Sequence, residues 1–137
     1  MGWLSRALTH EMAAVQQYLA QSVLARLWGD YALSSQLRRE AVEELQHAER
    51  LMERLIVLGI APSAGNLPPA RLGRTVEEML AADRVLEVDA VRLYEQAVTH
   101  AERMRDADCA ALLKGILAEE IAHVQELDGM SHGQHHG

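Results

Sequence analysis

Two short motifs of this sequence place a histidine three residues after a glutamate. On a helix this spacing brings the carboxylate and the imidazole onto one face, one turn apart. A further glutamate stands 33 residues before each motif, so that two equally spaced sets are present. The sets are Glu11, Glu44 and His47, and Glu87, Glu120 and His123. Carboxylate and imidazole groups in this number could bind metal ions.

The equal spacing has a structural meaning if each set lies on a helical hairpin. In two antiparallel helices, residues equidistant from the turn lie side by side. The midpoint between the lone glutamate and its motif falls at 28–29 in the first set and at 103–104 in the second. If both places are turns, each lone glutamate lies level with its motif. Two such hairpins packed together would bring all six donors to one level of one core.

The distribution of helix formers, glycine and proline predicts four helices. We expect them at 4–27, 31–58, 76–102 and 107–128, with turns at 28–30 and 103–106. Gly29 breaks the chain after the first helix, Thr75 caps the third, and Gly129 ends the fourth. Residues 131–137, which contain three histidines, are expected to form a disordered tail that could bind metal loosely.

The 16 residues from Gly59 to Arg74 contain all three prolines and break the helical pattern. Sixteen extended residues reach at most about 55 Å, whereas a helix the length of residues 31–58 measures about 42 Å. The segment can therefore run the length of the protein and start the third helix parallel to the second. We predict an all-α four-helix bundle with a long crossover, not a simple up-down-up-down bundle.

The four glutamates lie in the middle of inward stripes that are otherwise mostly apolar. Buried carboxylates are costly and repel one another. None of the 13 basic residues lies on these stripes, so we expect two divalent cations to supply the compensating charge. Tyr18 and Tyr94 stand seven residues after Glu11 and Glu87, and Asp83 lies on the third stripe. The internal repeat therefore includes a tyrosine as well as the donors.

Composition restricts the class of protein further. A chain of 137 residues with 49% apolar residues predicts one domain, at residues 1–130. No apolar run approaches the length of a membrane span, and the N-terminus lacks the apolar stretch of a secretory signal. One cysteine, Cys109, excludes an intramolecular disulfide and favours the cytoplasm. The net charge of −7 argues against a nucleic-acid partner and suits attraction of cations.

The donor types favour particular metals. No thiolate is among them, which argues against structural zinc and iron–sulfur sites. Carboxylates with one imidazole per metal suit iron or manganese. Four carboxylates can support both the ferrous and the oxo-bridged ferric states without a large net charge, which favours redox chemistry with oxygen or peroxide.

These motifs resemble bacterioferritin, a branch of the ferritin superfamily whose donor set is that of di-iron carboxylate bundles. The resemblance runs from about Leu4 to Leu127 and matches all six donor positions without a shift in spacing. It is carried by Glu11 with Gln17-Tyr18, Trp28-Gly29, Glu44-x-x-His47-Ala48, Leu86-Glu87-Val88-Asp89 and Glu119-Glu120-x-x-His123. It implies a cage-forming bundle that oxidises ferrous iron at a di-iron centre inside each subunit and stores ferric mineral.

The resemblance also implies a role for each site residue. One iron is bound by Glu11 and His47, the other by Glu87 and His123, and both are bridged by Glu44 and Glu120. Tyr18 matches a tyrosine beside the site, which could supply an electron or a hydrogen bond, or could only pack in the core.

The sequence departs from the family in three places. The family's haem-ligating methionine follows the first glutamate of the motif, where this chain has Leu45, so we expect no haem there. A displaced haem near Met52 is the alternative. An accessory iron site of the family uses a histidine and an acid, where Arg39 and Glu43 stand. The sequence stops at Gly137, without the family's short fifth helix.

The first two helices carry a second apolar face, which suits self-association through two-fold dimers. Its residues are Leu19, Val23, Leu24, Leu27, Leu45 and Met52. Because the fifth helix lines the four-fold axes in the resembling family, we expect a dodecamer or a dimer in preference to a 24-mer.

Several functions stay open at this point. The leading one is a ferroxidase and iron-storage protein that uses oxygen or hydrogen peroxide. The alternatives are a rubrerythrin-like di-iron peroxidase or a manganese catalase. A non-catalytic iron buffer or helical scaffold is a further alternative.

Overall fold

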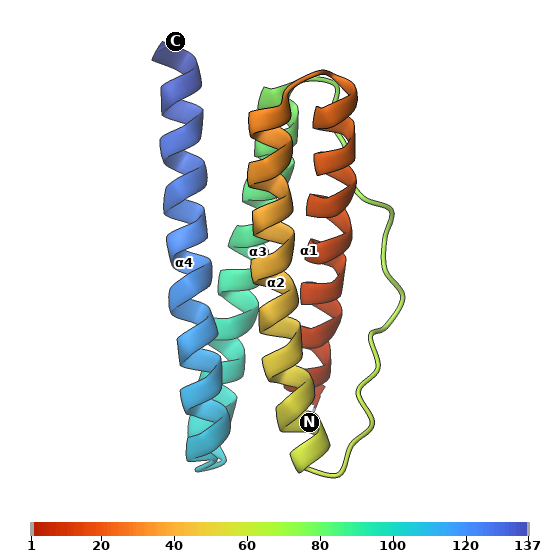
Figure 1. Ribbon diagram of the computed structural model, residues 1–137. Coiled ribbons are helices and arrows are strands. Elements are labelled where there is room, and N and C mark those ends of the chain that lie inside the picture. Colours follow the sequence, from red (N-terminus) through yellow and green to blue (C-terminus); the bar gives the residue numbers. More distant parts are fainter. Residues whose placement is uncertain (1, 137) are drawn as a thin grey trace. The chain divides into compact units, whose positions relative to one another are not determined.

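A computed structural model describes residues 2–136 of the chain, with the side chains of residues 2–130. In this range the chain forms four helices and no strand, as predicted (Figure 1). The helices are α1 (Gly2–Leu27), α2 (Tyr31–Val57), α3 (Val76–Arg103) and α4 (Ala107–His136). They divide into two compact units, Met1–Leu72 and Gly73–Gly137, each of which contains one helical hairpin. Within the described residues, no helix contains an apolar stretch that could span a lipid bilayer.

The first hairpin consists of α1 and α2, which lie side by side in opposite directions (Figure 1). Gly29 has a φ of +83°, so that the backbone N–H groups of Gly29 and Asp30 return to the carbonyls of Arg26 and Ala25, both at 2.9 Å. The Asp30 carboxylate then accepts a hydrogen bond of 3.1 Å from the N–H of Leu33 and caps α2. The predicted turn at 28–30 is confirmed.

The segment after α2 runs along α1 (Figure 1). The N–H of Gly65 donates to Thr9 Oγ1 at 2.9 Å, and the Nε2 groups of Gln16 and Gln21 donate to the carbonyls of residues 68 and 71, both at 2.8 Å. From Thr9 to Gln21 an α-helix rises about 18 Å, and the six steps from 65 to 71 cover about 19 Å in extended conformation. The segment therefore follows α1 toward its C-terminal end, which confirms the predicted long crossover.

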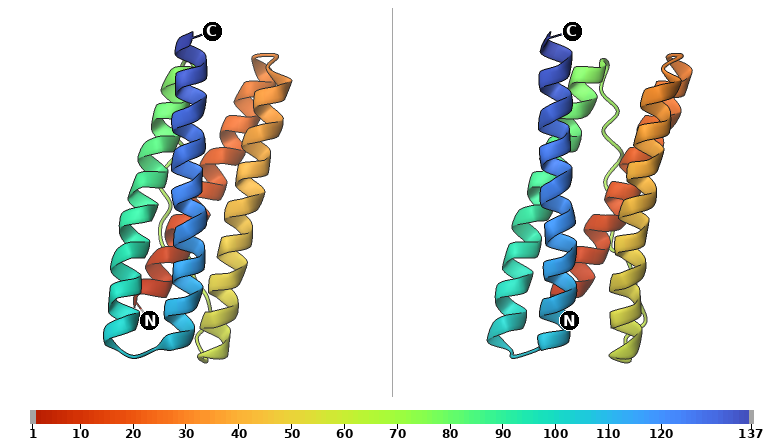
Figure 2. Two further views of the ribbon diagram at one scale, coloured as in Figure 1. Left: turned by 90° about the vertical axis from the view of Figure 1, so that its left-hand side faces the viewer. Right: turned by 60° about the vertical axis from the view of Figure 1, so that its left-hand side comes forward.

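The second hairpin consists of α3 and α4, which are antiparallel neighbours in both views of Figure 2. Its turn has no glycine, and Arg105 adopts the left-handed conformation with a φ of 55°. The N–H groups of Arg105 and Asp106 return to the carbonyls of Glu102 and Ala101 at 3.1 and 2.9 Å. The Asp106 carboxylate accepts from the N–H of Cys109 at 3.1 Å and caps α4. The predicted turn at 103–106 is confirmed.

The predicted end of the fourth helix at Gly129 is wrong, because α4 continues to His136. Gly129 does not take the positive φ of a helix-ending glycine. A glycine inside a helix costs only about 1 kcal/mol relative to alanine, so it does not end a helix by itself. The disorder predicted for residues 131–137 stays a prediction, since their side chains and residue 137 lie outside the described part.

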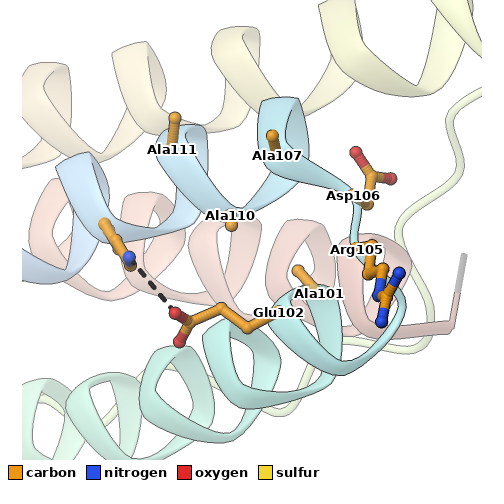
Figure 3. Close-up of a pocket in the computed structure, with 8 residues that line it drawn as sticks. Ala101, Glu102, Arg105, Asp106, Ala107, Ala110 and Ala111 are labelled. Atoms are coloured by element: carbon orange, nitrogen blue, oxygen red, sulfur yellow. Dashed lines mark ion pairs between the residues drawn. The ribbon is translucent and has the colours of Figure 1, made fainter.

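A groove of about 480 Å³ opens beside the α3–α4 turn (Figure 3). It is lined by alanines of both helices and by Arg105, Asp106 and the ion pair of Glu102 with Lys114, whose charged groups lie 3.4 Å apart. None of the six predicted metal donors lines this groove. It is therefore separate from the site that the sequence predicts.

Candidate metal site

The first set of predicted donors meets inside the first hairpin, and we call it the first half-site. Glu11 lies on α1, and Glu44 and His47 lie one turn apart on α2. The Nδ1 atom of His47 is 2.8 Å from Glu11 Oε2 and 3.8 Å from Glu44 Oε1. The exposed fractions of Glu11, Glu44 and His47 are 0%, 0% and 1%. Equal distance from the turn thus places the lone glutamate level with its motif.

The second set meets in the same way inside the second hairpin, as the second half-site. Glu87 lies on α3, and Glu120 and His123 lie on α4. The Nδ1 atom of His123 is 3.6 Å from Glu87 Oε2 and 3.7 Å from Glu120 Oε2. Both glutamates are fully buried, and His123 is 6% exposed. Each hairpin therefore carries two carboxylates and one imidazole at its centre.

The burial of these carboxylates is not matched by buried basic residues. Among the side chains that the structure describes, no lysine or arginine is buried. Asp83 on α3 is also fully buried. Our sequence reasoning placed Asp83 on the inward stripe but gave it no role, although an acid on an apolar stripe was the available signal. Bound cations are a natural source of the missing positive charge.

The donor atoms are of types that bind metal ions, and those of each half-site lie close together. In each half-site one ligand atom from each of the three residues lies within 4.8 Å of the other two. Oxygen or nitrogen ligands about 2.1 Å from a common ion are about 3.0 to 3.6 Å apart at bond angles between 90 and 120°. Carboxylate oxygen with imidazole nitrogen suits iron or manganese. The residues present can therefore hold such ions.

The other residues singled out in the sequence have different surroundings. Tyr18 and Tyr94 are buried in α1 and α3, at equivalent positions of the repeat. Leu45 is 40% exposed, so the position at which the family has a haem-ligating methionine lies at the surface of the described chain. Arg39 and Glu43 are exposed as well.

Comparison with known proteins decides the family. A family model described as "Ferritin-like domain" matches residues 3–132, nearly the whole chain. This chain belongs to the ferritin-like family. The predicted fold class, an all-α ferritin-like four-helix bundle, is thereby confirmed. The single domain predicted for residues 1–130 stays a prediction.

Curated members of the ferritin-like family add a more specific similarity. The chain is 30% identical to a bacterioferritin of Mycobacterium bovis over 125 residues, which are 91% of this chain and 79% of that protein. It is 33% identical to a bacterioferritin of Brucella melitensis over 125 residues, 91% of this chain and 78% of the other. A bacterioferritin of Rhodobacter capsulatus is 29% identical over 126 residues, covering 92% and 78%. The resemblance to bacterioferritins drawn from the sequence is confirmed.

Proposed function

We propose that this ferritin-like protein binds ferrous iron, oxidises it to ferric iron with oxygen or hydrogen peroxide, and stores the product in the cytoplasm. The observation that carries the proposal is the pair of buried half-sites, each with two carboxylates and one imidazole. Membership of the ferritin-like family and similarity to bacterioferritins support iron as the metal.

The proposed centre combines the two half-sites. In the arrangement that the resemblance implies, Glu11 and His47 hold one iron ion, and Glu87 and His123 hold the other. Glu44 and Glu120 then bridge the two ions. Four carboxylates carry four negative charges, which two ferrous ions balance, so that the buried centre is neutral when it is loaded.

The residues of this chain contribute position and electrostatics to the reaction. Two bound ferrous ions give up one electron each, and the oxidant accepts both. The rigid helices hold the six donors so that little rearrangement is needed when the charge of the ions rises. No lysine or arginine is buried among the side chains of residues 2–130, which keeps the surroundings favourable to that additional positive charge.

Tyr18 is proposed to assist the oxidation, as an electron donor or as a hydrogen-bond donor to the ligands. Its burial in α1 and its position seven residues after Glu11 support this role. A tyrosine that only packs in the core would leave the oxidation rate unchanged in Tyr18→Phe. A lower rate with unchanged metal binding is expected if Tyr18 takes part.

The test is a stopped-flow measurement of ferric absorbance after metal-free protein is loaded with ferrous iron and mixed with oxygen or peroxide. We expect rapid oxidation of two iron ions per chain. Glu44→Ala and Glu120→Ala should abolish the rapid phase, since each removes a proposed bridging carboxylate. Glu53→Ala is the matched control, because it removes an exposed carboxylate of α2 that belongs to neither half-site.

Two outcomes would change the conclusion. If the wild-type protein oxidises iron no faster than buffer with either oxidant, it is not a ferroxidase, and a buffering or scaffold role would remain. Because the donor set suits manganese equally well, metal analysis of the purified protein decides between iron and manganese. Stoichiometric manganese would favour a catalase or peroxidase.

The assembly is proposed to form through two-fold dimers that bury an apolar surface of the first hairpin. Leu19 and Val23 on α1, and Val42 and Leu45 on α2, are exposed by 40 to 46%. We propose that pairs of chains bury this surface and that a dodecamer or an isolated dimer results. Similarity to bacterioferritins supports an oligomer.

Light scattering on iron-free protein measures the assembly directly. Leu19→Glu and Val23→Glu should reduce the mass by breaking the dimer. Glu95→Gln, at an exposed position of α3, should leave it unchanged. A wild-type monomer at micromolar concentration would contradict the proposed interface, and a mass near 24 chains would contradict the proposed size.

A further inference from the structure

Tyr94 is a buried tyrosine without a role in the reaction described so far, and we propose that it supplies an electron to oxygen together with Tyr18. Two ferrous ions and two tyrosines then reduce one oxygen molecule to water, and no hydrogen peroxide is released. This inference rests on the proposed function, because it concerns how the same oxidation ends. It is carried by a repeated segment, by the burial of both tyrosines and by the number of electrons that oxygen accepts.

The repeated segment joins each tyrosine to the lone glutamate of its set. Its pattern is Glu-x-x-Ala-Val-x-x-Tyr, at residues 11–18 of α1 and 87–94 of α3. Glutamate and tyrosine are about 10.5 Å apart along the helix axis, and they share one face because seven residues turn the helix by about 700°. The repeat therefore extends beyond the metal donors to a tyrosine at a fixed position.

The residue between glutamate and tyrosine on this face is small in both hairpins. It is Ala14 in α1 and Ala90 in α3, which are 0% and 1% exposed. Long side chains of helices lean toward the N-terminal end, which for each tyrosine is the end nearer to its glutamate. An alanine at this position leaves room for the ring to lean in that direction. Tyr94 is therefore placed relative to the donors of its hairpin as Tyr18 is.

Both tyrosines are buried together with their hydroxyl groups' end of the helix face, and this burial favours a chemical role. Tyr18 and Tyr94 are 1% and 0% exposed, and the Tyr94 hydroxyl oxygen is buried. A buried hydroxyl needs a partner or costs free energy, which a phenylalanine of similar size avoids. The chain has three tyrosines and no phenylalanine, and the third, Tyr31, is 68% exposed. Packing alone needs only the ring, whereas an electron donor needs the phenol.

The electron count explains why two tyrosines are needed. Oxygen forms hydrogen peroxide with two electrons and water with four, and each ferrous ion supplies one. One tyrosine would add a third electron and leave a reactive oxygen radical, whereas two tyrosines complete the four. Two ferrous ions, two tyrosines, one oxygen molecule and two protons from solvent give two ferric ions, two tyrosyl radicals and two water molecules. The two phenolic protons also end in the water.

Hydrogen peroxide as the oxidant requires fewer electrons. It needs two electrons to become water, and the two ferrous ions supply both. The tyrosines therefore stay reduced when peroxide is the oxidant and are oxidised only by oxygen. This dependence on the oxidant separates an electron donor from a residue that only holds the donors in place, because loss of the latter would impair both reactions.

The experiment is a single turnover of the metal-free, full-length protein after it is loaded with two ferrous ions per chain. After mixing with oxygen, electron paramagnetic resonance of frozen samples measures the tyrosyl radicals, and a peroxidase-coupled dye measures hydrogen peroxide. We expect radicals and almost no peroxide from the wild-type protein. Protein produced with ring-deuterated tyrosine should give a narrower radical signal, which identifies the radical as tyrosyl.

Tyr94→Phe removes the hydroxyl and keeps the ring. It should abolish the radicals and raise the yield of hydrogen peroxide to one molecule per two iron ions, with the amount of ferric iron unchanged. Tyr18→Phe and the double variant should give the same yield, because one tyrosine alone cannot complete the reduction to water. Tyr31→Phe is the matched control at an exposed position and should behave like the wild-type protein.

Two results would overturn the role of Tyr94 as an electron donor. One is a yield of one peroxide per two iron ions in the wild-type protein, or an unchanged low yield in Tyr94→Phe. The other is a Tyr94→Phe variant that also slows the reaction with peroxide, which would show a structural role. Circular dichroism checks the folding of each variant. If Tyr94→Phe fails to fold, the wild-type protein decides, because more than one tyrosyl radical per chain requires a second tyrosine.

Failure of the inference can be distinguished from failure of the proposed function. Fast oxidation of iron by oxygen with release of peroxide would contradict the inference alone. Iron that is oxidised no faster than in buffer would contradict the proposed function, and the inference with it.

Discussion

His47 Nδ1 lies 2.8 Å from Glu11 Oε2, across a hairpin that brings together residues 36 positions apart in the sequence. The equivalent atoms of the second hairpin, His123 Nδ1 and Glu87 Oε2, are 3.6 Å apart, which is too long for a good hydrogen bond. The repeat in the sequence thus gives two similar hairpins with different connections between their helices.

This difference predicts unequal stability of two histidine variants in the metal-free protein. His47→Ala removes the 2.8 Å hydrogen bond between His47 and Glu11, which joins two helices, whereas the matched His123→Ala removes a buried imidazole whose Nδ1 is 3.6 Å from Glu87 Oε2. A charge-assisted hydrogen bond contributes about 1.5 to 3 kcal/mol, so His47→Ala should have the lower free energy of unfolding. Urea unfolding of iron-free protein measures both values. Equal unfolding free energies would show that the 2.8 Å contact contributes nothing.

Metal binding should stabilise the protein and release protons. A metal that binds the folded chain but not the unfolded chain adds about 2.7 kcal/mol to the free energy of unfolding when the free metal concentration is 100 times the dissociation constant. Carboxylate and imidazole ligands bind metal in their deprotonated forms, so protons leave as the ion enters. Calorimetric titration with Zn²⁺ in two buffers of different ionisation enthalpy measures this release. No proton release would contradict a buried site that is assembled before metal arrives.

The turn between α3 and α4 should be improved by Arg105→Gly. Arg105 has a φ of 55°, and the left-handed conformation costs a residue with a side chain about 1 to 2 kcal/mol. Glycine avoids this cost but loses about 0.5 to 1 kcal/mol through the entropy of the unfolded chain, so a net gain of about 0.5 to 1 kcal/mol is expected. Thermal unfolding is the measurement. A lower melting temperature would show that the Arg105 side chain stabilises the fold.

Gly29→Ala, in the turn between α1 and α2, is the matched control for Arg105→Gly. Gly29 has a φ of +83°, and a Cβ added there meets nothing within 4 Å. The expected loss of about 1 kcal/mol in the free energy of unfolding therefore comes from the left-handed backbone conformation, which alanine disfavours.

The crossover segment should open locally when its attachment to α1 is weakened. No residue from 59 to 74 is buried, so hydrogen bonds from α1 contribute much of its attachment. Gln21→Ala removes the donor to the Arg71 carbonyl and should speed tryptic cleavage at Arg71 several-fold, up to about tenfold. Gln16→Ala removes an exposed bond of the same kind and should have a smaller effect. Unchanged cleavage in Gln21→Ala would mean that other contacts hold the segment.

The exposed position of Leu45 gives a prediction for haem. Leucine offers no lone pair to iron, so protein from haem-supplemented cells should lack a strong Soret band. Leu45→Met should create one if the dimer forms as proposed, because it restores the ligand that the resembling family uses. A stoichiometric band in the wild-type protein that disappears in Met52→Ala would show a displaced haem.

Most of the helices could be predicted from the sequence, because their signals are local. Gly29 and the capping residues Asp30 and Thr75 lie at helix ends in the structure. The turn at Arg105 was predictable only from the symmetric spacing of the donors, since no residue type marks it. Gly129 was misleading, because the same residue type is tolerated inside a helix and at its end.

The number of residues between each donor and the turn can be read from the sequence, and it predicted that the donors of each set meet inside one hairpin. It did not predict the difference between the two half-sites. A shift of 0.8 Å between two histidine–glutamate distances depends on side-chain packing, for which residue spacing has no signal. Asp83 was visible as an acid on an apolar stripe, but its complete burial was seen only in the structure.

Two copies of either hairpin would carry the same number of carboxylates and imidazoles as the whole chain. In such a pair every substitution would occur twice, and both halves of the centre would stay identical. One covalent chain removes this restriction, because its two hairpins can carry different residues at equivalent positions, as Ala7 and Asp83 do. A single chain can therefore hold two binding places that are alike in their donors and different in their surroundings.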